Sequence, residues 1–272
     1  MCHRSQYYFV SLPSRWQLLK MSPQEMYNYV GDGPNGVIKY VSLTDDRVEE
    51  AIAVQQCSMY QECIALGVDM YGETGAAKEM QIVFREVIKD GCSVVAIDVN
   101  TDRVIAVAFN KLHMALTNGR KDPLEIFVEN NIKYKACLGL INFLGNIESS
   151  VDLFKKYDVS STMEIFYVGT DPRYRGCSIG QRVVEASLAL ARCIRNKKCG
   201  KTPIGKELTN RHTIPEVAFG VFTSEYSQRI AAKLNFEWLT TVYYEQYYYE
   251  GKKFSDRIGD IHKTARLGAI RL

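Results

Sequence analysis

The sequence has few histidines, no paired cysteines and no long apolar run. Its four histidines are never spaced as metal ligands, and its eight cysteines contain no Cys-x-x-Cys pair, so no metal site is expected. No stretch of about 18 apolar residues occurs, which argues against a membrane-spanning helix. The first 20 residues lack the continuous apolar segment of a signal peptide, and the cysteine spacing indicates reduced thiols. We therefore expect a cytoplasmic protein.

Strong charge of either sign is also missing. The 34 basic and 31 acidic residues leave a formal net charge of +3, so there is no electrostatic signal for binding nucleic acid. About half of the 272 residues are apolar, enough for one large domain with a proper core. Composition therefore predicts no nucleic-acid partner and no membrane contact, and we expect a monomer.

The pattern of apolar residues and turns predicts a single α/β (α+β) domain with a mostly antiparallel mixed sheet. Residues 1–36 are irregular and are interpreted as an N-terminal arm, followed by the domain at 37–272. The predicted strands are 37–43, 92–99, 104–112, 163–169, 216–222, 236–249 and 264–272. The predicted helices are 47–67, 76–89, 124–146, 179–199 and 224–234.

The junction between the strand 163–169 and the helix that begins at Ile179 has the clearest signal for ligand binding. A buried strand ends at Gly169, "DPRYRGCSIGQ" follows, and a helix begins at Ile179. Unpaired backbone amides and partial positive charge at a helix N-terminus bind anions, and glycines let oxygen atoms come close. Arg173 adds positive charge, and a phosphate or pyrophosphate is the expected ligand. The residues predicted to hold it are Arg175, Gly176, Cys177, Ser178, Ile179, Gly180 and Gln181.

Other phosphate-binding patterns fit less well. The dinucleotide pattern Gly-x-Gly-x-x-Gly is absent. "CGKT" at 199–202 ends like a nucleoside-triphosphate loop, but Arg195 stands where that loop needs its first glycine. The remaining pattern is Arg-Gly-x-x-Ile-Gly after a strand and Asp-Pro.

This pattern resembles motif A of the GCN5-related N-acetyltransferases, (Gln/Arg)-x-x-Gly-x-(Gly/Ala). Arg175 fills its first place and Gly180 its last, whereas Ser178 stands in place of the middle glycine. Residues 222–239 resemble motif B, a strand, a helix and a second strand. The resemblance covers Val37 to about Leu272. It implies the acetyltransferase fold, with the diphosphate of acetyl-CoA held by the amides of the junction and no metal.

The sequence is similar in particular to the insect arylalkylamine (dopamine) N-acetyltransferases. Those enzymes carry Asp-Glu-Pro before a Leu-Gly near the end of the first helix, and "YQECIALG" keeps Glu62 while losing the Asp and the Pro. They also carry two hydroxyl residues four apart, matched by Thr223 and Ser227. The resemblance implies acetyl transfer to a small primary amine such as dopamine or serotonin. The changed context of Glu62 indicates a divergent member.

Glu62 is the candidate general base. Alkylamines titrate near the lysine reference of about 10.4, so at neutral pH they arrive protonated and a carboxylate must remove that proton. A partly desolvated site would raise the pKa of Glu62 towards neutrality. The alternative is an ordinary exposed glutamate at a helix end.

The hydroxyl residues have two interpretations. Thr223 and Ser227 either orient the amine and protonate the leaving thiolate, or belong to helix capping, in which Thr223 or Ser224 is a good N-cap. Tyr226 is an alternative proton donor, or simply a partly buried aromatic. Cys63 and Cys177 have no histidine nearby in sequence, so direct transfer is favoured over a cysteine nucleophile.

The strand before the junction is implied to serve the thioester. Backbone groups at Val168, Gly169 and Thr170 are expected to stabilise the carbonyl oxygen and to pair with the amide-containing pantetheine arm. Two alternatives stay open. One is an acyl-CoA-binding sensor without catalysis, suggested by Ser178 and the altered Glu62 context. The other is an acyltransferase for polyamines, for other amines or from longer acyl-CoA.

Overall fold

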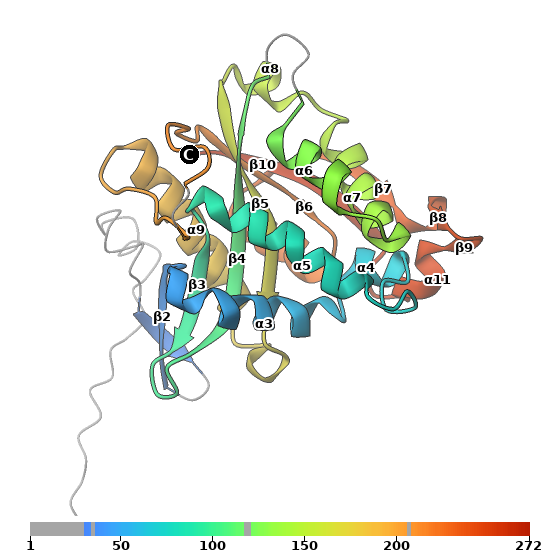
Figure 1. The fold of residues 1–272 in the computed structure, drawn as a ribbon, viewed down its shortest axis with the longest axis horizontal. Coiled ribbons are helices and arrows are strands. Elements are labelled where there is room, and N and C mark those ends of the chain that lie inside the picture. The colour runs from blue at the N-terminus through green and yellow to red at the C-terminus, as the bar shows by residue number, and fades with distance from the viewer. Residues whose placement is uncertain (1–29, 34–35, 117–120, 206–207) are drawn as a thin grey trace, which may run out of the picture.

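The computed structural model describes residues 30–33, 36–116, 121–205 and 208–272, which contain an eight-stranded sheet (Figure 1). Its strand order is β1-β2-β3-β4-β5-β6-β10-β7, and only the β5–β6 pair within it is parallel. The mostly antiparallel mixed sheet predicted from the sequence is therefore confirmed. The strands are β1 Val30–Gly33, β2 Gly36–Ser42, β3 Val94–Asp98, β4 Arg103–Met114, β5 Ser161–Thr170, β6 Val217–Phe222, β7 Glu237–Tyr243 and β10 Thr264–Arg271, beside a small ribbon of β8 Tyr248–Tyr249 and β9 Lys252–Lys253.

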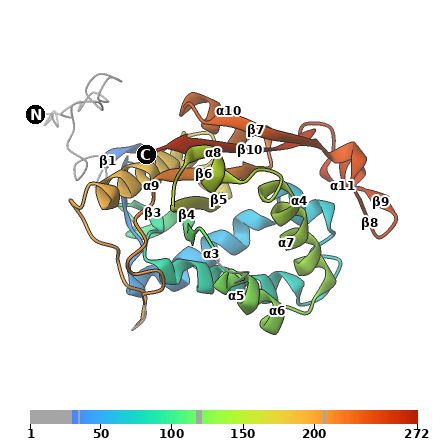
Figure 2. The ribbon, with the colours of Figure 1, turned by 90° about the horizontal axis from the view of Figure 1, so that it is seen from above.

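Helices cover both faces of the sheet (Figure 2), with α3, α5 and α7 on one side and α9 and α10 on the other. The helices are α3 Val48–Met59, α4 Cys63–Gly67, α5 Ala76–Val87, α6 Pro123–Asn131, α7 Lys135–Glu148, α8 Leu153–Tyr157, α9 Ile179–Arg195, α10 Glu225–Lys233 and α11 Phe254–Ile258. Short 3-10 turns are η1 Asp45–Arg47, η2 Ile88–Asp90, η3 Pro172–Tyr174 and η4 Tyr244–Gln246.

Two apolar cores follow from this layering. Successive side chains of a strand point to opposite faces, so Val95 of β3 packs with α3 and α5 while Val94 packs with α9. Along α9 the buried residues Ile179, Val183 and Leu190 recur at helical spacing and seal the second core. The long helix α9, which follows the junction, thus packs against the sheet with its buried face.

Four predicted segments differ from the structure. The helix expected over 47–67 is interrupted: α3 ends at Met59, and α4 starts after Glu62, whose backbone is extended. The stretch 124–146 divides into α6 and α7, because Ile132 and Tyr134 adopt extended conformations. The long strand 236–249 ends at Tyr243, where the chain enters η4. The helix expected to Cys199 ends at Arg195.

The sheet also begins earlier than expected. Residues 30–33, predicted as part of the arm, form β1 and pair with β2 from Val30↔Lys39 to Gly33↔Gly36. The glycines flanking the turn sequence suit a tight hairpin. Residues 34–35 and the rest of the predicted arm, 1–29, lie outside the described residues.

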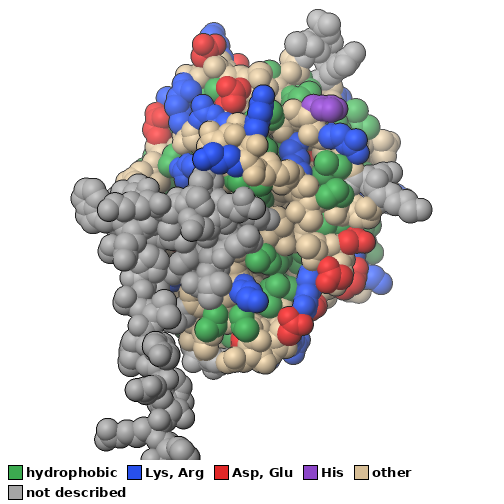
Figure 3. All heavy atoms as spheres, turned by 90° about the vertical axis from the view of Figure 1, so that its left-hand side faces the viewer, with side chains coloured by type: hydrophobic (Ala, Val, Ile, Leu, Met, Phe, Trp, Pro, Cys, Tyr) green, Lys and Arg blue, Asp and Glu red, His purple; other side chains and the backbone are tan. Residues whose placement is uncertain are grey.

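The surface seen in Figure 3 mixes charges of both signs. Lys and Arg side chains lie among Asp, Glu and apolar side chains there, without forming one continuous patch of a single sign. Within the described ranges, no helix is long and apolar enough to cross a membrane. The same residues contain no group of three or more His, Cys, Asp or Glu placed to hold a metal ion.

Candidate active site

The parallel strands β5 and β6 separate after three rungs. Their register pairs Thr162 with Val217 and ends with Glu164 opposite Phe219. β5 then continues to Thr170 without a described strand partner on that edge. Its backbone N–H and C=O groups can therefore pair with an extended ligand that carries amides. The separated part of β5 contains Val168, Gly169 and Thr170, the residues that the sequence analysis singled out.

A β-bulge accompanies the separation. Tyr167 of β5 lies opposite Phe109, and Ile165 lies opposite Asn110, so Phe166 has no partner on β4. An extra residue bends a strand and increases its local twist, and such bulges are frequent next to active sites. No sequence signal marked this bulge, because "EIFYVG" reads as an uninterrupted strand.

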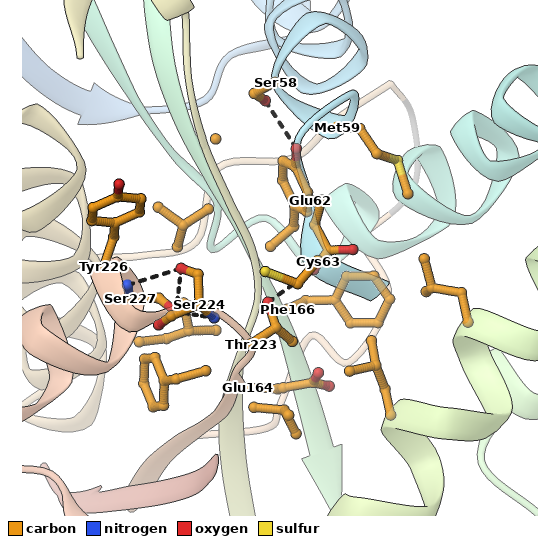
Figure 4. Close-up of a pocket in the computed structure, with 18 of the residues that line it drawn as sticks. Ser58, Met59, Glu62, Cys63, Glu164, Phe166, Thr223, Ser224, Tyr226 and Ser227 are labelled. Carbon is orange, nitrogen blue, oxygen red and sulfur yellow. Dashed lines mark hydrogen bonds between the residues drawn. The ribbon is translucent and has the colours of Figure 1, made fainter. Parts of the chain in front are cut away.

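A cavity of about 1360 Å³ opens where the strands separate (Figure 4). Its walls are the end of β5, the loop before α9, the start of α10 and the residue before α4. The predicted site residues that line it are Glu62, Val168, Gly169, Thr170, Arg175, Gly176, Ser178, Ile179, Gly180, Gln181, Thr223 and Ser227. Cys177 is not part of the lining and packs against the core beneath α9 instead.

The loop before α9 contains two residues with positive φ. Gly176 has φ +80°, and Ser178 has φ +58° and ψ +13°, the left-handed region that favours glycine. For a serine this conformation costs about 1–2 kcal/mol. No side chain caps α9, so the amides of its first turn, including Gly180 and Gln181, are left for a ligand. Ser178 thus adopts the conformation expected of the missing glycine.

The two arginines of the loop differ in their partners. The guanidinium of Arg173 donates to both carboxylate oxygens of Asp171, at 3.1 and 2.6 Å. Arg175 donates to the side-chain oxygen of Gln61, close to Glu62 in the chain. Only Arg175 lines the cavity, so its positive charge is available to an anion there, while that of Arg173 is offset by Asp171.

Glu62 sits where the first helix is interrupted. It is the N-cap of α4: Oε2 accepts a hydrogen bond of 2.7 Å from the backbone N–H of Ala65. Its other oxygen, Oε1, accepts one of 2.8 Å from the Thr223 hydroxyl (Figure 4). Burial raises the pKa of the Glu62 carboxyl above its usual range, although the hydrogen bonds from Ala65 N–H, Ile64 N–H and Thr223 limit the rise. Glu62 therefore presents to the cavity a carboxyl that is held by two hydrogen bonds and has a raised pKa.

The other hydroxyl residues form the start of α10. Ser224, not Thr223, is the N-cap, and it shares a capping box with Ser227 (Figure 4). The Ser227 hydroxyl donates to the carbonyl of Ser224 at 2.9 Å. Tyr226 is 60% exposed, at the cavity rim, with its ring against His262. Thr223 is thus free of a capping role, and Ser227 has one.

A buried tyrosine that the sequence did not mark lies next to Thr223. Tyr244 is fully buried, and its hydroxyl donates to the backbone carbonyl of Thr223. It thereby fixes the residue that contacts Glu62. The tyrosines at 243–249 look alike in the sequence. Tyr244 is buried because β7 ends at Tyr243 and the chain enters η4 there, which the sequence did not indicate.

Cys63 lies beside Glu62 but is poorly suited to nucleophilic attack. It is buried, and burial together with the neighbouring Glu62 carboxylate raises the pKa of its thiol. A thiol kept protonated is a weak nucleophile. Cys63 is therefore a poor candidate for the nucleophile.

Comparison with known proteins supports the fold. No protein-family model matches the sequence, and no curated protein matches it at the sequence level. Among solved structures, the chain is similar to arylalkylamine N-acetyltransferase 2 of Aedes aegypti, with 18% identity and a TM-score of 0.64 over 86% of this chain and 98% of that one. It is also similar to a mosquito arylalkylamine N-acetyltransferase-like 5b, with 20% identity and a TM-score of 0.63 over 86% of this chain and 100% of that one. A third similar structure is the polyamine N-acetyltransferase of Drosophila melanogaster, which forms N-acetylagmatine. It has 15% identity and a TM-score of 0.57 over 86% of this chain and 100% of that one.

The chain therefore has the GCN5-related N-acetyltransferase fold, as the resemblance implied.

Proposed function

We propose that this protein is an acetyl-CoA-dependent N-acetyltransferase that acts on a small primary amine. The observation that carries the proposal is one cavity that joins the splayed edge of β5, the uncapped first turn of α9 and the Glu62–Thr223 pair. The arylalkylamine and polyamine N-acetyltransferases that share the fold support an amine as the acceptor.

The residues present fit acetyl-CoA. The amides of Gly180 and Gln181 and the guanidinium of Arg175 suit a diphosphate, and the β5 edge at 168–170 suits the pantetheine amides. When bound, acetyl-CoA supplies a thioester carbonyl that an amine attacks with release of the thiol. A backbone N–H at the end of β5 donates to the carbonyl oxygen as it gains charge.

Glu62 accepts the proton of the incoming ammonium, directly or through a water. Thr223 keeps the carboxylate pointed into the cavity through its 2.8 Å hydrogen bond. We propose Ser227 as a contact for the amine or the leaving thiolate, supported by its place in the cavity lining; Tyr226 is the alternative donor at the rim. A cytoplasmic location is supported by free thiols at all seven cysteines of the described ranges.

Turnover with a panel of amines tests the proposal. Purified protein with acetyl-CoA should release free thiol when aryl- and alkylamines are added. Glu62→Gln should lower kcat by about 10²–10⁴-fold, the usual contribution of a general base, and leave the Kd for acetyl-CoA unchanged. Equal losses in kcat and acetyl-CoA binding would remove the role of base, and no thiol release with any amine would refute the proposal.

A second candidate is an acyl-CoA sensor on the same fold. It is favoured by one observation: both Glu62 oxygens and the Ser227 hydroxyl already have structural hydrogen-bond partners. A sensor would bind acetyl-CoA tightly and produce no acetylated amine, so the same panel together with a binding titration separates the two candidates.

A further inference from the structure

The bulge in β5 changes which of its side chains lie on the same side of the sheet as Glu62. Successive residues of a regular strand point to opposite faces of the sheet. Phe166 and Tyr167, however, both pack with the core on the side of α3 and α5. Ile165 and Val168 both pack with the core on the side of α9. The bulge therefore places an additional aromatic ring, that of Phe166, on the side where Glu62 precedes α4.

The ring of Phe166 is supported on one side and open on the other. It meets the ring of Phe84 of α5 edge to face, with the ring centroids 5.9 Å apart and the planes at 83°. Phe84 also contacts Tyr167, at 5.0 Å between centroids, and is only 2% exposed. Phe166 itself is half-buried and lines the cavity. A ring packed in this way keeps its orientation and leaves the rest of its surface to a ligand.

The open part of the ring lies in the same pocket as the proposed base. Figure 4 shows Phe166 close to Cys63 and Thr223, and the Thr223 hydroxyl contacts the Glu62 carboxyl. Much of the neighbouring lining on this side of the sheet is apolar. The cavity-lining side chains of α4, α5 and α7 that pack with the same core are Leu66, Met80, Val83, Ile141 and Leu144. An amine whose nitrogen reaches Glu62 from this side would therefore have its carbon skeleton next to Phe166.

Resting on the proposed function, we propose that Phe166 is a residue that determines acceptor specificity. Its ring packs against a flat apolar group close to the reacting nitrogen. Two aromatic rings in contact bind about twofold to tenfold more tightly than burial of the same area alone would give. Val168 and the first turn of α9 lie on the other side of the sheet, so the contact is made with the acceptor and not with the cofactor. Phe166 has no part in the transfer of the proton.

Flatness at constant size is the variable to test. 2-Phenylethylamine and 2-cyclohexylethylamine have the same number of carbon atoms, and only the first has a flat ring. We expect the wild-type protein with acetyl-CoA to use 2-phenylethylamine with the higher kcat/KM. Phe166→Leu keeps an apolar side chain and removes the flat ring. The ratio of kcat/KM for the phenyl amine to that for the cyclohexyl amine should fall about twofold to tenfold in this variant, with the Kd for acetyl-CoA unchanged.

Two further variants control the test. Phe166→Tyr keeps a flat ring at the cavity and should retain the wild-type ratio. Phe109→Leu removes a ring that contacts Phe84 at 5.7 Å but is fully buried and does not line the cavity. It should lower the Tm and leave the ratio unchanged. A fall in the ratio as large as that of Phe166→Leu would show that packing among these rings controls the preference, and the inference would then be wrong.

The outcomes separate this inference from the proposed function. The same ratio in wild type and Phe166→Leu, with both amines acetylated, would overturn the inference and leave the acetyltransferase proposal in place. A loss of acetyl-CoA affinity as large as the loss for 2-phenylethylamine would also overturn it, because the ring would then contact the cofactor.

If neither amine is acetylated, the acetyltransferase proposal fails and binding still tests the inference. Calorimetry with CoA-saturated protein compares the Kd values of the two amines without turnover. Tighter binding of 2-phenylethylamine that is lost in Phe166→Leu would support the inference. Equal Kd values for the two amines in the wild-type protein would refute it.

Discussion

Gly180→Ala separates the stability of the first turn of α9 from its role in binding. A Cβ at Gly180 would lie 3.6 Å from Thr170 Oγ1 and 3.7 Å from Ile230 Cδ1, which are ordinary van der Waals distances. The variant should therefore fold. Alanine in place of a helical glycine stabilises by about 0.5–1 kcal/mol, which corresponds to a Tm rise of about 1–4 °C for a domain of this size.

Ligand binding should change in the opposite direction. The added methyl group projects where phosphate oxygens must approach the amides of the turn, since Gly180 lines the cavity. Overpacking a close contact costs about 1–3 kcal/mol, so the Kd for acetyl-CoA should rise about fivefold to 150-fold. Calorimetry gives the Kd, and thermal unfolding of the same preparations gives the Tm.

Gly145→Ala is the matched control. Gly145 is also a helical glycine that lines the cavity, but it lies in α7, and its added Cβ would meet nothing within 4 Å. It should raise the Tm by a similar amount and leave the acetyl-CoA Kd unchanged. An unchanged Kd in Gly180→Ala, with normal folding, would show that this turn does not hold the diphosphate and would refute the reasoning behind the proposed function.

Two further predictions concern Thr223 and Ser178. Thr223→Val removes the hydroxyl that stabilises the ionised Glu62, so the pKa of Glu62 should rise further. Because kcat/KM is lost as the pH falls through that pKa, the acid limb of the pH profile of kcat/KM should move to higher pH. An acid limb that stays in place would mean that another group controls it. Ser178→Gly relieves a left-handed serine and should raise unfolding stability by about 1 kcal/mol, measured by denaturant titration, with acetyl-CoA binding retained; a loss of stability would contradict the strain inferred from φ.

The sequence predicted the fold class, and most of the residues it singled out line one cavity, because both follow from local pattern. The hairpin of β3 and β4, the strand β5 and the helix α9 follow from apolar periodicity and turns, which neighbouring residues determine. The loop before α9 is likewise one continuous stretch of sequence, so Arg175 to Gln181 could be identified together. The helix boundaries were less accurate: nothing in "SMYQECIALG" showed that the chain leaves the helix before Glu62.

Contacts between distant segments were decided only by the tertiary structure. Glu62 and Thr223 are 161 positions apart, and their hydrogen bond exists because α4 and the end of β6 meet at the mouth of the separated strands. His113, Glu148 and Glu164 lie on β4, α7 and β5, and they line one cavity only because these elements enclose it. By itself the sequence determined most of the strands and helices and the glycine-containing turn before α9, since these need only local backbone preferences. Which side chains share a desolvated space, and hence their charge and chemistry, depended on long-range packing.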